Sequence, residues 1–252
     1  MNSVACHQVY IRQFEPLDEE LRMAMLADLS AAERERIALS RSARVRDKLL
    51  QSRWWLRQCL SLQHAELAAH AWPIEADAHG KPLLSCLYQG APIQFNVSHS
   101  GNYLAIVIAS GNDAVGIDIE QIKPQRRWQE IAEQYFTPSE LQLLQAQPST
   151  EQAAMFYRLW VLKEALLKAK GVGLTAPLAA YDFSRAELHA VSATRLQSVH
   201  RWRETTAQVW QSWLMAPTPQ LLLAVTLATA QTPVSWQLVP SSTLADYWRA
   251  RR

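Results

Sequence analysis

The sequence predicts an α+β protein made of two similar lobes. Hydrophobic residues make up 49% of the 252 residues and charged residues 19%, so the chain can bury a substantial core. Helix and strand patterns occur twice in a similar order: strand, helix and strands, then helix and strands. We expect the boundary near residues 110–114, which gives an N-terminal lobe of residues 1–112 and a C-terminal lobe of residues 113–252.

The N-terminal lobe is expected to begin with a strand over residues 4–14 and to continue with helices. The tetrapeptide Ser30-Ala31-Ala32-Glu33 has the spacing of a capping box, in which two polar side chains bind backbone N–H groups at a helix start. A second helix runs to about Leu62. Beyond Pro73, glycine turns separate short strands near residues 83–87, 93–97, 103–109 and 115–120.

The C-terminal lobe is expected to hold two helices and further strands. Thr137-Pro138-Ser139-Glu140 supplies an N-cap, a proline at the first helical position and a glutamate three residues after the cap, which together predict a helix start. A long helix over about residues 152–170 stops at Gly171. Strands follow near residues 208–214 and 221–226, and the chain ends in a tryptophan-bearing helix or tail.

Composition and charge exclude several classes of protein. The formal net charge of +2 is too small to predict nucleic-acid binding. The three cysteines are odd in number and form no CxxC pair, so we expect neither a disulfide framework nor a zinc site. No apolar run is long enough to cross a bilayer, and the first twenty residues lack the pattern of a signal peptide. We therefore expect a cytoplasmic protein.

The middle third of the chain, which contains all seven glycines, has two acidic residues on one predicted strand. Side chains alternate between the faces of a strand, so Asp118 and Glu120 share one face of the strand at 115–120. Like charges at this spacing repel each other unless a cation lies between them. Oxygen ligands without histidine or cysteine suit Mg²⁺, which commonly binds one or two carboxylates and substrate phosphates. The alternative is a solvated strand face.

A third acidic residue lies on the long predicted helix. Glu164 and Lys168 are four residues apart and share a face, which by itself is typical of a surface ion pair. Phe156 and Trp160 precede Glu164 at the same spacing, so this face continues an aromatic stripe that we expect to be buried. A charged pair at the edge of a buried stripe needs a partner. A metal ion bound by Glu164 and a phosphate bound by Lys168 would provide one.

The segment Phe95-Asn96-Val97-Ser98-His99-Ser100-Gly101 runs from a predicted strand into a glycine turn. The side chains of Ser98, His99 and Ser100 and the turn N–H groups are donors of the kind that bind phosphate oxygens, and a polar strand end is the alternative. Catalysis by a Ser-His pair is not favoured, because adjacent residues of a strand point apart and no GxSxG turn is present.

Two further features are basic. The turn His79-Gly80-Lys81-Pro82 presents a lysine, but it is not a P-loop because the GxxxxGK[ST] pattern is absent. The early helices carry a basic patch that would serve one anionic ligand or an acidic protein partner, or would simply be solvated. The patch comprises Arg34, Arg36, Arg41, Arg44, Arg46, Lys48, Arg53 and Arg57.

The order of these motifs resembles the phosphopantetheinyl transferases, specifically the larger surfactin-synthetase-activating (Sfp) type. The similar segments are GKP, FNVSHSG, VGIDIE and FYRLWVLKEALLKAKGVGL, preceded by SAAERER and joined by YFTPSE, all within about residues 30–180. The resemblance implies a pseudo-twofold fold of two α+β lobes, with coenzyme A in the cleft between them. Because two lobes already form the cleft, we expect a monomer.

The resemblance also implies the residues of the site. Asp118, Glu120 and Glu164 would bind Mg²⁺. The catalytic residues would be Glu164 and Lys168, with either Glu164 or a metal-bound water as the base and Lys168 at the diphosphate. Coenzyme A would be bound by Arg36, Lys48, Gly80, Lys81, Pro82, Ser98, His99 and Lys168.

The implied activity is that of a 4′-phosphopantetheinyl transferase of the holo-[acyl-carrier-protein] synthase type (EC 2.7.8.7). Such an enzyme moves the phosphopantetheine of coenzyme A to a serine of an apo acyl or peptidyl carrier protein and releases 3′,5′-ADP. Two departures from the family pattern, Glu33 in place of lysine and Lys48 in place of arginine, concern the binding of the 3′-phosphate. The alternatives are a metal-dependent phosphohydrolase acting on coenzyme A or a related nucleotide, and a non-catalytic binding protein.

Overall fold

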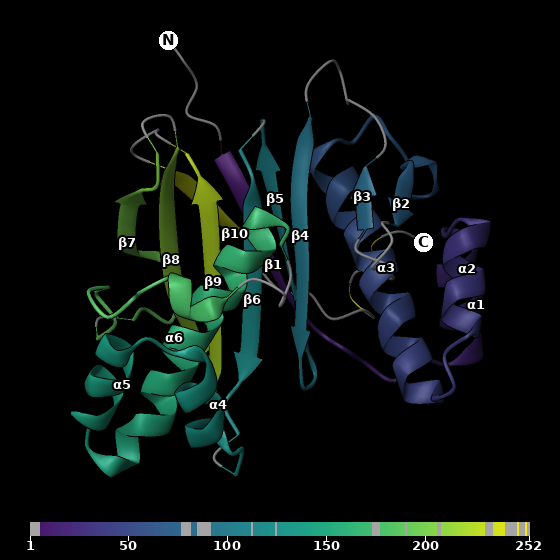
Figure 1. The fold of residues 1–252 in the computed structure, drawn as a ribbon. Helices are drawn as coiled ribbons and strands as arrows, with labels where there is room; N and C mark the ends of the chain where they lie inside the picture. Colours follow the sequence, from purple (N-terminus) through teal and green to yellow (C-terminus); the bar gives the residue numbers. More distant parts are fainter. Residues whose placement is uncertain are drawn as a thin grey trace.

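The computed structural model has two lobes, each with one four-stranded sheet (Figure 1). It describes residues 6–76, 82–84, 92–111, 113–123, 125–172, 177–189, 191–205, 208–229, 234–239, 246 and 250. Helices and strands are mixed along the whole chain, so the predicted α+β class is confirmed.

The N-terminal lobe combines a sheet with three helices and a small hairpin. The sheet has the order β10-β1-β5-β4, with strands β10 (Ser235–Val239), β1 (Cys6–Gln13), β5 (Tyr103–Ser110) and β4 (Ile93–Ser100). The helices are α1 (Glu19–Ala27), α2 (Ala31–Ala38) and α3 (Ala43–Gln63), followed by the single turn η1 (Ala69–Ala71). The hairpin consists of β2 (Ile74–Ala76) and β3 (Pro82–Leu84), which pair antiparallel.

The C-terminal lobe has a meander of antiparallel strands covered by helices. The sheet has the order β6-β9-β8-β7, with strands β6 (Val115–Gln121), β9 (Leu221–Ala228), β8 (Val209–Thr218) and β7 (Gln197–Arg203). The helices are α4 (Trp128–Tyr135), α5 (Pro138–Gln145) and α6 (Ser149–Lys170), followed by the single turn η3 (Leu178–Ala180). Figure 1 shows α4, α5 and α6 on one face of this sheet.

Most of the predicted elements are present, with ends shifted by a few residues. Ser30 and Thr137 both begin their helices through complete capping boxes, as the two tetrapeptides predict. Gly171 ends α6 with a φ of 70°, in the left-handed region that favours glycine. The strand predicted near residues 83–87 is observed as β3 over 82–84, and residues 85–91 lie outside the described part. Elements α1, α4, β2, β7 and β10 are not among the predicted ones.

The last strand, β10, returns to the first sheet. It lies parallel to β1, with residues 235–239 in register with residues 6–10. The end of the chain thus completes the N-terminal sheet, which a division at residue 112 does not anticipate. The division into lobes of 1–112 and 113–252 stays a prediction.

Each lobe has its own apolar core, and a third core lies between the two sheets. Helix α3 packs on β1 and β5 through Trp54, Trp55 and Leu56, and α6 packs on the second sheet through residues such as Phe156 and Leu166. The third core joins apolar side chains of β1 and β5 to those of β6, β8 and β9. None of the helices in the described ranges is long and apolar enough to cross a membrane.

Polar side chains of β4 connect the facing edges of the two sheets. Three backbone N–H groups of β6 donate to side-chain oxygens of β4, in the pairs Ile117 to Asn96 (3.1 Å), Ile119 to Ser98 (3.4 Å) and Gln121 to Ser100 (3.1 Å). A buried N–H group without an acceptor is costly in free energy. The side chains of β4 supply the acceptors that the backbone of a neighbouring strand would otherwise provide at the edge of β6. The FNVSHS segment therefore holds the lobes together as well as lying beside the acidic strand.

Candidate active site

The acidic strand β6 has the alternation that the sequence predicts. Ile117 and Ile119 are buried in the core between the sheets, at 0% and 1% exposure. Asp118 and Glu120 point to the other face, where Asp118 is buried and Glu120 is half-buried. The two carboxylates therefore lie on the face that meets α6.

Gly116 allows α6 to approach this face closely. A Cβ atom at Gly116 would lie 2.1 Å from the carbonyl oxygen of Ala165 and 2.4 Å from the backbone nitrogen of Ala169, closer than any real contact. Only glycine fits at such a backbone crossing. Glu164 and Lys168 each precede one of these alanines, so the crossing brings both to the acidic face.

Lys168 lies on the acidic strand rather than in solvent. Its Nζ donates to Asp118 Oδ1 at 2.7 Å and to Ser98 Oγ at 2.8 Å. Ser98 Oγ in turn donates to Asp118 Oδ1 at 2.8 Å. The sequence groups Lys168 with Glu164 by helical spacing, and the structure adds Asp118 and Ser98 to the same cluster.

The hydroxyl groups of β4 hold the carboxylates of β6 in place. Besides the contact between Ser98 and Asp118, Ser100 Oγ donates to Glu120 Oε2 at 2.5 Å. Each hydroxyl thus accepts from a backbone N–H group of β6 and donates to the neighbouring carboxylate. The orientation of both acids is fixed from the N-terminal lobe, although the acids belong to the C-terminal lobe.

Glu164 lies in surroundings that oppose its ionisation. Burial first, and then the negative charges of Asp118 and Glu120, raise the pKa of Glu164 to about 7, although Lys168 opposes this. Burial also raises the pKa of Glu120, and Asp118 adds to that shift while Ser100 opposes it. The cluster therefore has more negative charge than its own cations neutralise.

The acidic cluster has carboxylate oxygens suited to a hard cation. Asp118 Oδ2 and Glu164 Oε1 are buried and have no hydrogen-bond partner among the described residues. Unpaired buried carboxylate oxygens are costly, and a divalent cation would satisfy them. As the side chains lie here, no three His, Cys, Asp or Glu residues within the described ranges already form a metal-binding group. The residue types and the two unpaired oxygens fit Mg²⁺. When Mg²⁺ binds Asp118, Lys168 must either keep its hydrogen bond to the same carboxylate or move away from it.

Arg126 is a site residue that the sequence patterns missed. Its Nη1 lies 3.6 Å from Glu120 Oε1, and its guanidinium group lies over the rings of Trp160 (5.4 Å) and Tyr157 (6.0 Å). It comes from the loop between β6 and α4, where no motif marks it. The buried aromatic stripe ahead of Glu164 is the one signal that pointed to this place, since Trp160 belongs to it.

Lys163, the residue before Glu164 in the FYRLWVLKEALLKAKGVGL segment, does not reach the acidic cluster. It is fully buried, and its Nζ binds Glu140 Oε2 at 2.8 Å and the carbonyl oxygen of Leu178 at 2.9 Å. Glu140 also completes the capping box of α5 and accepts from the N–H group of Phe183 at 2.9 Å. Lys163 therefore joins α6 to the start of α5 and to the segment after it.

His99 and Lys48 lie together on the other face of β4. The exposed ring of His99 meets the Phe14 ring edge-on, with the two ring centroids 6.4 Å apart. Lys48 Nζ lies 5.2 Å from the centroid of the same Phe14 ring and donates to the carbonyl oxygen of Gly101. Partial desolvation first, and then the charges of Lys168 and Lys48, lower the pKa of His99. Ser98 and His99 point apart, as the strand pattern predicts, and share no hydrogen bond.

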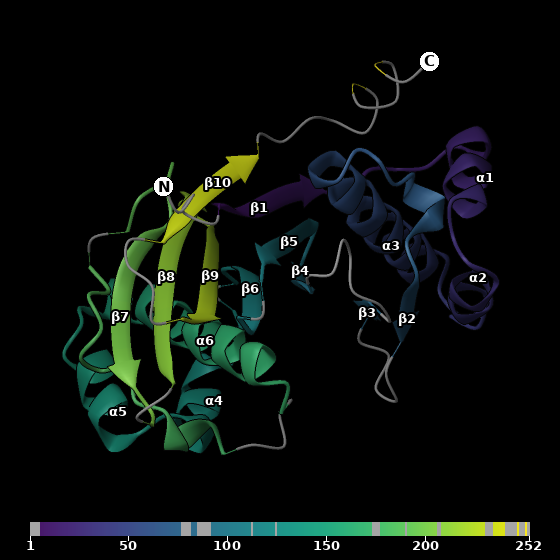
Figure 2. The same ribbon diagram turned by 90° about the horizontal axis from the view of Figure 1, so that it is seen from above.

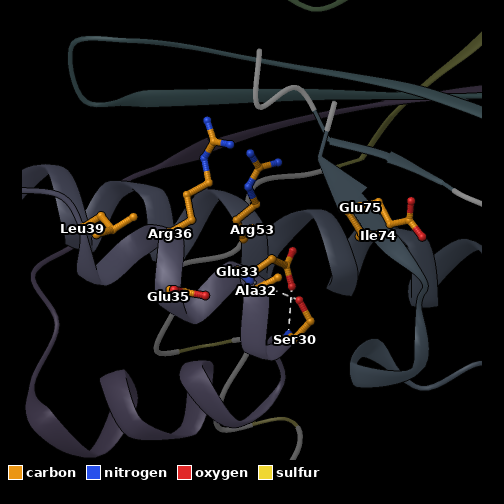
Figure 3. Close-up of a pocket in the computed structure, with 9 residues that line it drawn as sticks. All are labelled: Ser30, Ala32, Glu33, Glu35, Arg36, Leu39, Arg53, Ile74 and Glu75. Atoms are coloured by element: carbon orange, nitrogen blue, oxygen red, sulfur yellow. Dashed lines mark hydrogen bonds between the residues drawn. The ribbon is translucent and has the colours of Figure 1, made fainter. Parts of the chain in front are cut away.

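Arg36 lies away from the acidic cluster, at a cavity of about 680 Å³ formed by α2, α3 and β2 (Figure 3). Figure 3 shows the guanidinium groups of Arg36 and Arg53 side by side. Glu33, one of the two departures from the family pattern, has a structural role here. It completes the capping box with Ser30 and binds Arg57 at 2.6 Å.

The GKP turn is only partly described. Gly80 and Lys81 lie outside the described residues, so their roles stay predictions. Pro82 begins β3, is half-buried and lies opposite Ala76 of β2. The proposed contact of Pro82 with coenzyme A is likewise a prediction.

Comparisons with known proteins point to one family. Residues 114–226 match the family model described as the 4′-phosphopantetheinyl transferase superfamily, and residues 12–112 match the model of a 4′-phosphopantetheinyl transferase N-terminal region. The chain is 32% identical to the 4′-phosphopantetheinyl transferase psf-1 of Bacillus pumilus over 71% of this chain and 76% of the relative. It is 30% identical to Sfp of Bacillus subtilis strain 168, over 66% of this chain and 71% of the relative.

A further relative is HetI, a 4′-phosphopantetheinyl transferase of Nostoc, at 30% identity over 60% of this chain. The alignment spans 59% of the length of HetI. The predicted recognition and enzyme class are confirmed at the level of the family. The two matched models and the coverage of the Bacillus relatives establish that the chain belongs to the 4′-phosphopantetheinyl transferase superfamily, in its larger Sfp type.

Proposed function

We propose that this protein transfers the phosphopantetheine arm of coenzyme A to a serine hydroxyl of an apo acyl or peptidyl carrier protein. The observation that carries the proposal is the cluster of Asp118, Glu120 and Glu164 beside Lys168, with two buried carboxylate oxygens that have no partner among the described residues. Three acids and a lysine lie where α6 and β6 approach closely at Gly116. Such a group suits phosphoryl transfer, in which catalysis depends mainly on positioning and on electrostatic stabilisation of the transferred phosphoryl group.

Asp118, Glu120 and Glu164 would hold Mg²⁺. When bound, Mg²⁺ would supply Lewis-acid stabilisation for the negative charge of the diphosphate. Ser98 and Ser100 keep Asp118 and Glu120 in position through their hydroxyl groups. This support leaves Asp118 Oδ2 available, and that oxygen is one of the two unpaired ones.

Lys168 supplies the positive charge that meets the substrate phosphates. Its ammonium group already lies beside Asp118 and Ser98, at the centre of the cluster. An ammonium group donates to any oxygen within its reach, so Lys168 would bind the diphosphate as negative charge develops on the leaving 3′,5′-ADP.

Glu164 would accept the proton of the carrier serine. In the metal-free site, burial and the charges of Asp118 and Glu120 raise the pKa of Glu164 to about 7. The positive charge of bound Mg²⁺ would lower this pKa, so that Glu164 would be ionised and able to accept a proton at neutral pH. In the transfer, the serine oxygen forms a bond to the β-phosphorus, the bond from that phosphorus to 3′,5′-ADP breaks, and the serine proton goes to the carboxylate of Glu164.

The remaining contacts to coenzyme A would come from the N-terminal lobe. Arg36 at its cavity and Lys48 with His99 beside Phe14 are basic groups for the nucleotide. Gly80, Lys81 and Pro82 would add a turn beside them. The protein partner would be a small acidic carrier, and we propose a cytoplasmic monomer.

The test is a mass measurement on carrier proteins. A panel of apo acyl and peptidyl carriers is incubated with the protein, coenzyme A and Mg²⁺, with EDTA as the control. We expect at least one carrier to gain the mass of one phosphopantetheine group, and none to do so in EDTA. No gain on any carrier, together with release of 3′,5′-ADP in the absence of carriers, would favour the phosphohydrolase instead.

A further inference from the structure

Arg126 lies at the edge of the candidate site with its hydrogen-bond donors unused. Its Nη1 is 3.6 Å from Glu120 Oε1, which is beyond hydrogen-bond distance. The side chain of Arg126 donates no hydrogen bond within the described residues, and 32% of it is exposed. A guanidinium group has five N–H donors in a fork that matches the oxygens of a carboxylate or a phosphate. Arg126 therefore offers donors to an anionic ligand where the acidic strand ends.

Aromatic rings of α6 hold the guanidinium group of Arg126 in place. Its central carbon lies 5.4 Å from the ring centroid of Trp160 and 6.0 Å from that of Tyr157. A cation–π contact needs no hydrogen bond, so the N–H groups remain available to an anion. The rings are themselves fixed, because Trp160 stacks on Phe156 with 5.8 Å between the ring centroids and Tyr157 is fully buried. A group that is held in this way loses little conformational entropy when a ligand binds.

The backbone around Arg126 is also fixed beside α6. Tyr157 Oη accepts a hydrogen bond from the N–H group of Lys123 at 3.1 Å. The N–H group of Arg126 donates to the carbonyl oxygen of Lys123 at 3.1 Å, and its carbonyl oxygen accepts from the N–H group of Trp128 at 2.7 Å. Figures 1 and 2 show α4 next to α6 on the same face of the second sheet, so the segment before α4 passes alongside α6. The place of Arg126 therefore does not depend on Glu120 alone.

Arg126 adds a second cation to the acidic face of β6. Lys168 binds Asp118 at 2.7 Å, whereas Arg126 lies beside Glu120, two residues further along the strand. Residues at this spacing are about 7 Å apart along a strand, and a diphosphate has oxygens on two phosphorus atoms, so one ligand can reach both cations. Once Glu120 binds a divalent cation, its attraction for Arg126 is weaker, and the guanidinium group is free to turn to phosphate oxygens.

We propose that Arg126 is a further catalytic residue, which donates hydrogen bonds to the β-phosphate of coenzyme A and stabilises the negative charge of this group during its transfer. The proposal rests on the proposed function. Lys168 then serves the diphosphate beside Asp118, and Arg126 serves it beside Glu120. A guanidinium group on a transferred phosphoryl group accelerates the transfer because it neutralises charge in the transition state. Arg126 stays protonated throughout, so the bonds and protons exchanged in the reaction are unchanged.

The first experiment measures binding without any transfer. Isothermal titration calorimetry in Mg²⁺ compares coenzyme A with 3′,5′-ADP, which lacks the β-phosphate, for the wild type, Arg126→Gln, Arg126→Lys and Arg127→Gln. Arg127 is the matched control, because it is the next residue, its side chain is 83% exposed and it pairs only with Glu130 among the described residues. We expect Arg126→Gln to bind coenzyme A about tenfold more weakly and 3′,5′-ADP within about twofold of the wild type. Arg126→Lys should lie between, and Arg127→Gln should match the wild type.

The second experiment measures the transfer itself. Arg126→Gln should lower kcat for carrier modification about 100-fold and leave the KM for the carrier unchanged, whereas Arg127→Gln should keep the wild-type kcat. A normal kcat in folded Arg126→Gln, or an equal loss of affinity for both nucleotides, would overturn the proposal. A raised KM for the carrier with normal affinity for coenzyme A would also overturn it, and would make Arg126 a contact for the carrier instead.

A third measurement separates a direct role of Arg126 from one that acts through Glu120. Calorimetric titration with Mg²⁺ alone should show no loss of affinity in Arg126→Gln, because the substitution removes a positive charge beside the metal ligands. A weaker affinity for Mg²⁺ would mean that Arg126 positions Glu120, and would refute direct contact as the cause. If the wild type modifies no carrier, the proposed function fails, and the comparison of the two nucleotides still decides whether Arg126 binds the β-phosphate. Thermal unfolding of each variant identifies any loss of fold.

Discussion

Lys163 and Lys168 lie five residues apart on α6 and have opposite surroundings. Lys163 and its partner Glu140 are both 0% exposed, and the pair ties α6 to α5. Lys168 is 28% exposed along its side chain and lies beside Asp118 and Ser98. The same residue type thus serves the fold at one position and, in our account, the substrate at the other.

The two lysines give different predictions for stability and rate. Lys163→Met leaves the buried carboxylate of Glu140 without its partner, so we expect a loss of about 3–5 kcal/mol in the free energy of unfolding. Lys168→Met also removes a partner of the buried Asp118, but Ser98 still donates to that carboxylate, so we expect a smaller loss of about 1–2 kcal/mol and a fall in transfer rate of about 100-fold or more. Urea unfolding and the rate of carrier modification measure the two effects. A normal rate in Lys168→Met, or unchanged stability in Lys163→Met, would contradict the assignment.

Glu164 predicts a pH dependence of stability in metal-free protein. Its pKa rises from an ordinary 4.5 to about 7 on folding, so the folded state holds the proton more tightly. The resulting stabilisation is fully present below about pH 4.5 and is lost as the pH rises through about 7. In EDTA, Glu164→Gln should therefore gain on the order of 2–3 kcal/mol relative to the wild type between pH 4.5 and pH 8. Urea unfolding at both pH values tests this, and a constant difference between the two proteins would refute it.

At the scale of elements, the crossing of α6 over β6 places the proposed catalytic groups. Gly116→Ala drives a methyl group against the backbone of Ala165 and Ala169, which cannot move without shifting the helix. We expect a loss of about 3 kcal/mol or more in unfolding free energy and a large fall in transfer rate. Gly111→Ala is the matched control, because its added Cβ meets nothing within 4 Å and only its φ of 99° is strained. Equal effects of the two substitutions would argue against a close crossing at Gly116.

The connection between β4 and β6 is a second element-scale feature with a test. Asn96→Ala removes the acceptor of the buried N–H group of Ile117, so we expect it to destabilise the protein by about 1–3 kcal/mol. Gln94, two residues earlier on β4, makes no side-chain hydrogen bond within the described residues. Gln94→Ala should therefore lower the free energy of unfolding by less than about 0.5 kcal/mol. Denaturant unfolding compares them, and similar losses would mean that Asn96 does not hold the joint.

Local signals predicted the elements with strong caps and clear periodicity. The capping boxes at Ser30 and Thr137 and the stop at Gly171 are read from a few neighbouring residues, and all three are correct. Strand β10 was missed because its five residues become a strand only by pairing with β1, which lies more than two hundred residues earlier. Its place depends on tertiary contacts that no local pattern contains.

The candidate site also has features that local sequence patterns predict and features that depend on tertiary contacts. Alternation on β6 and helical spacing on α6 made Asp118, Glu120, Glu164 and Lys168 candidates, and the resemblance of the ordered motifs to the family assigned their roles. The contacts that join them were not readable, because Lys168 meets Ser98 across the joint between the lobes. Arg126 was missed as a site residue because its neighbours come from other elements.

At the scale of the whole molecule, both lobes contribute to the candidate site, and the acids come from the C-terminal lobe. The C-terminal lobe supplies the three acids and Lys168, whereas the N-terminal lobe supplies the hydroxyl groups of β4 and the arginines of α2 and α3. Strand β10 and the core between the sheets hold these parts together. A ligand with more than one anionic group suits such an arrangement.

The most direct test of the account is the rate at which an apo-carrier protein gains one phosphopantetheine group from coenzyme A in Mg²⁺, followed by mass spectrometry. The wild-type protein is compared with Asp118→Asn and Glu164→Gln, each shown by thermal unfolding to be folded. We predict that the wild type modifies the carrier and that both variants lose about 100-fold or more in rate, because each removes a charge from the acidic cluster. Folded variants that modify the carrier as fast as the wild type would contradict the account.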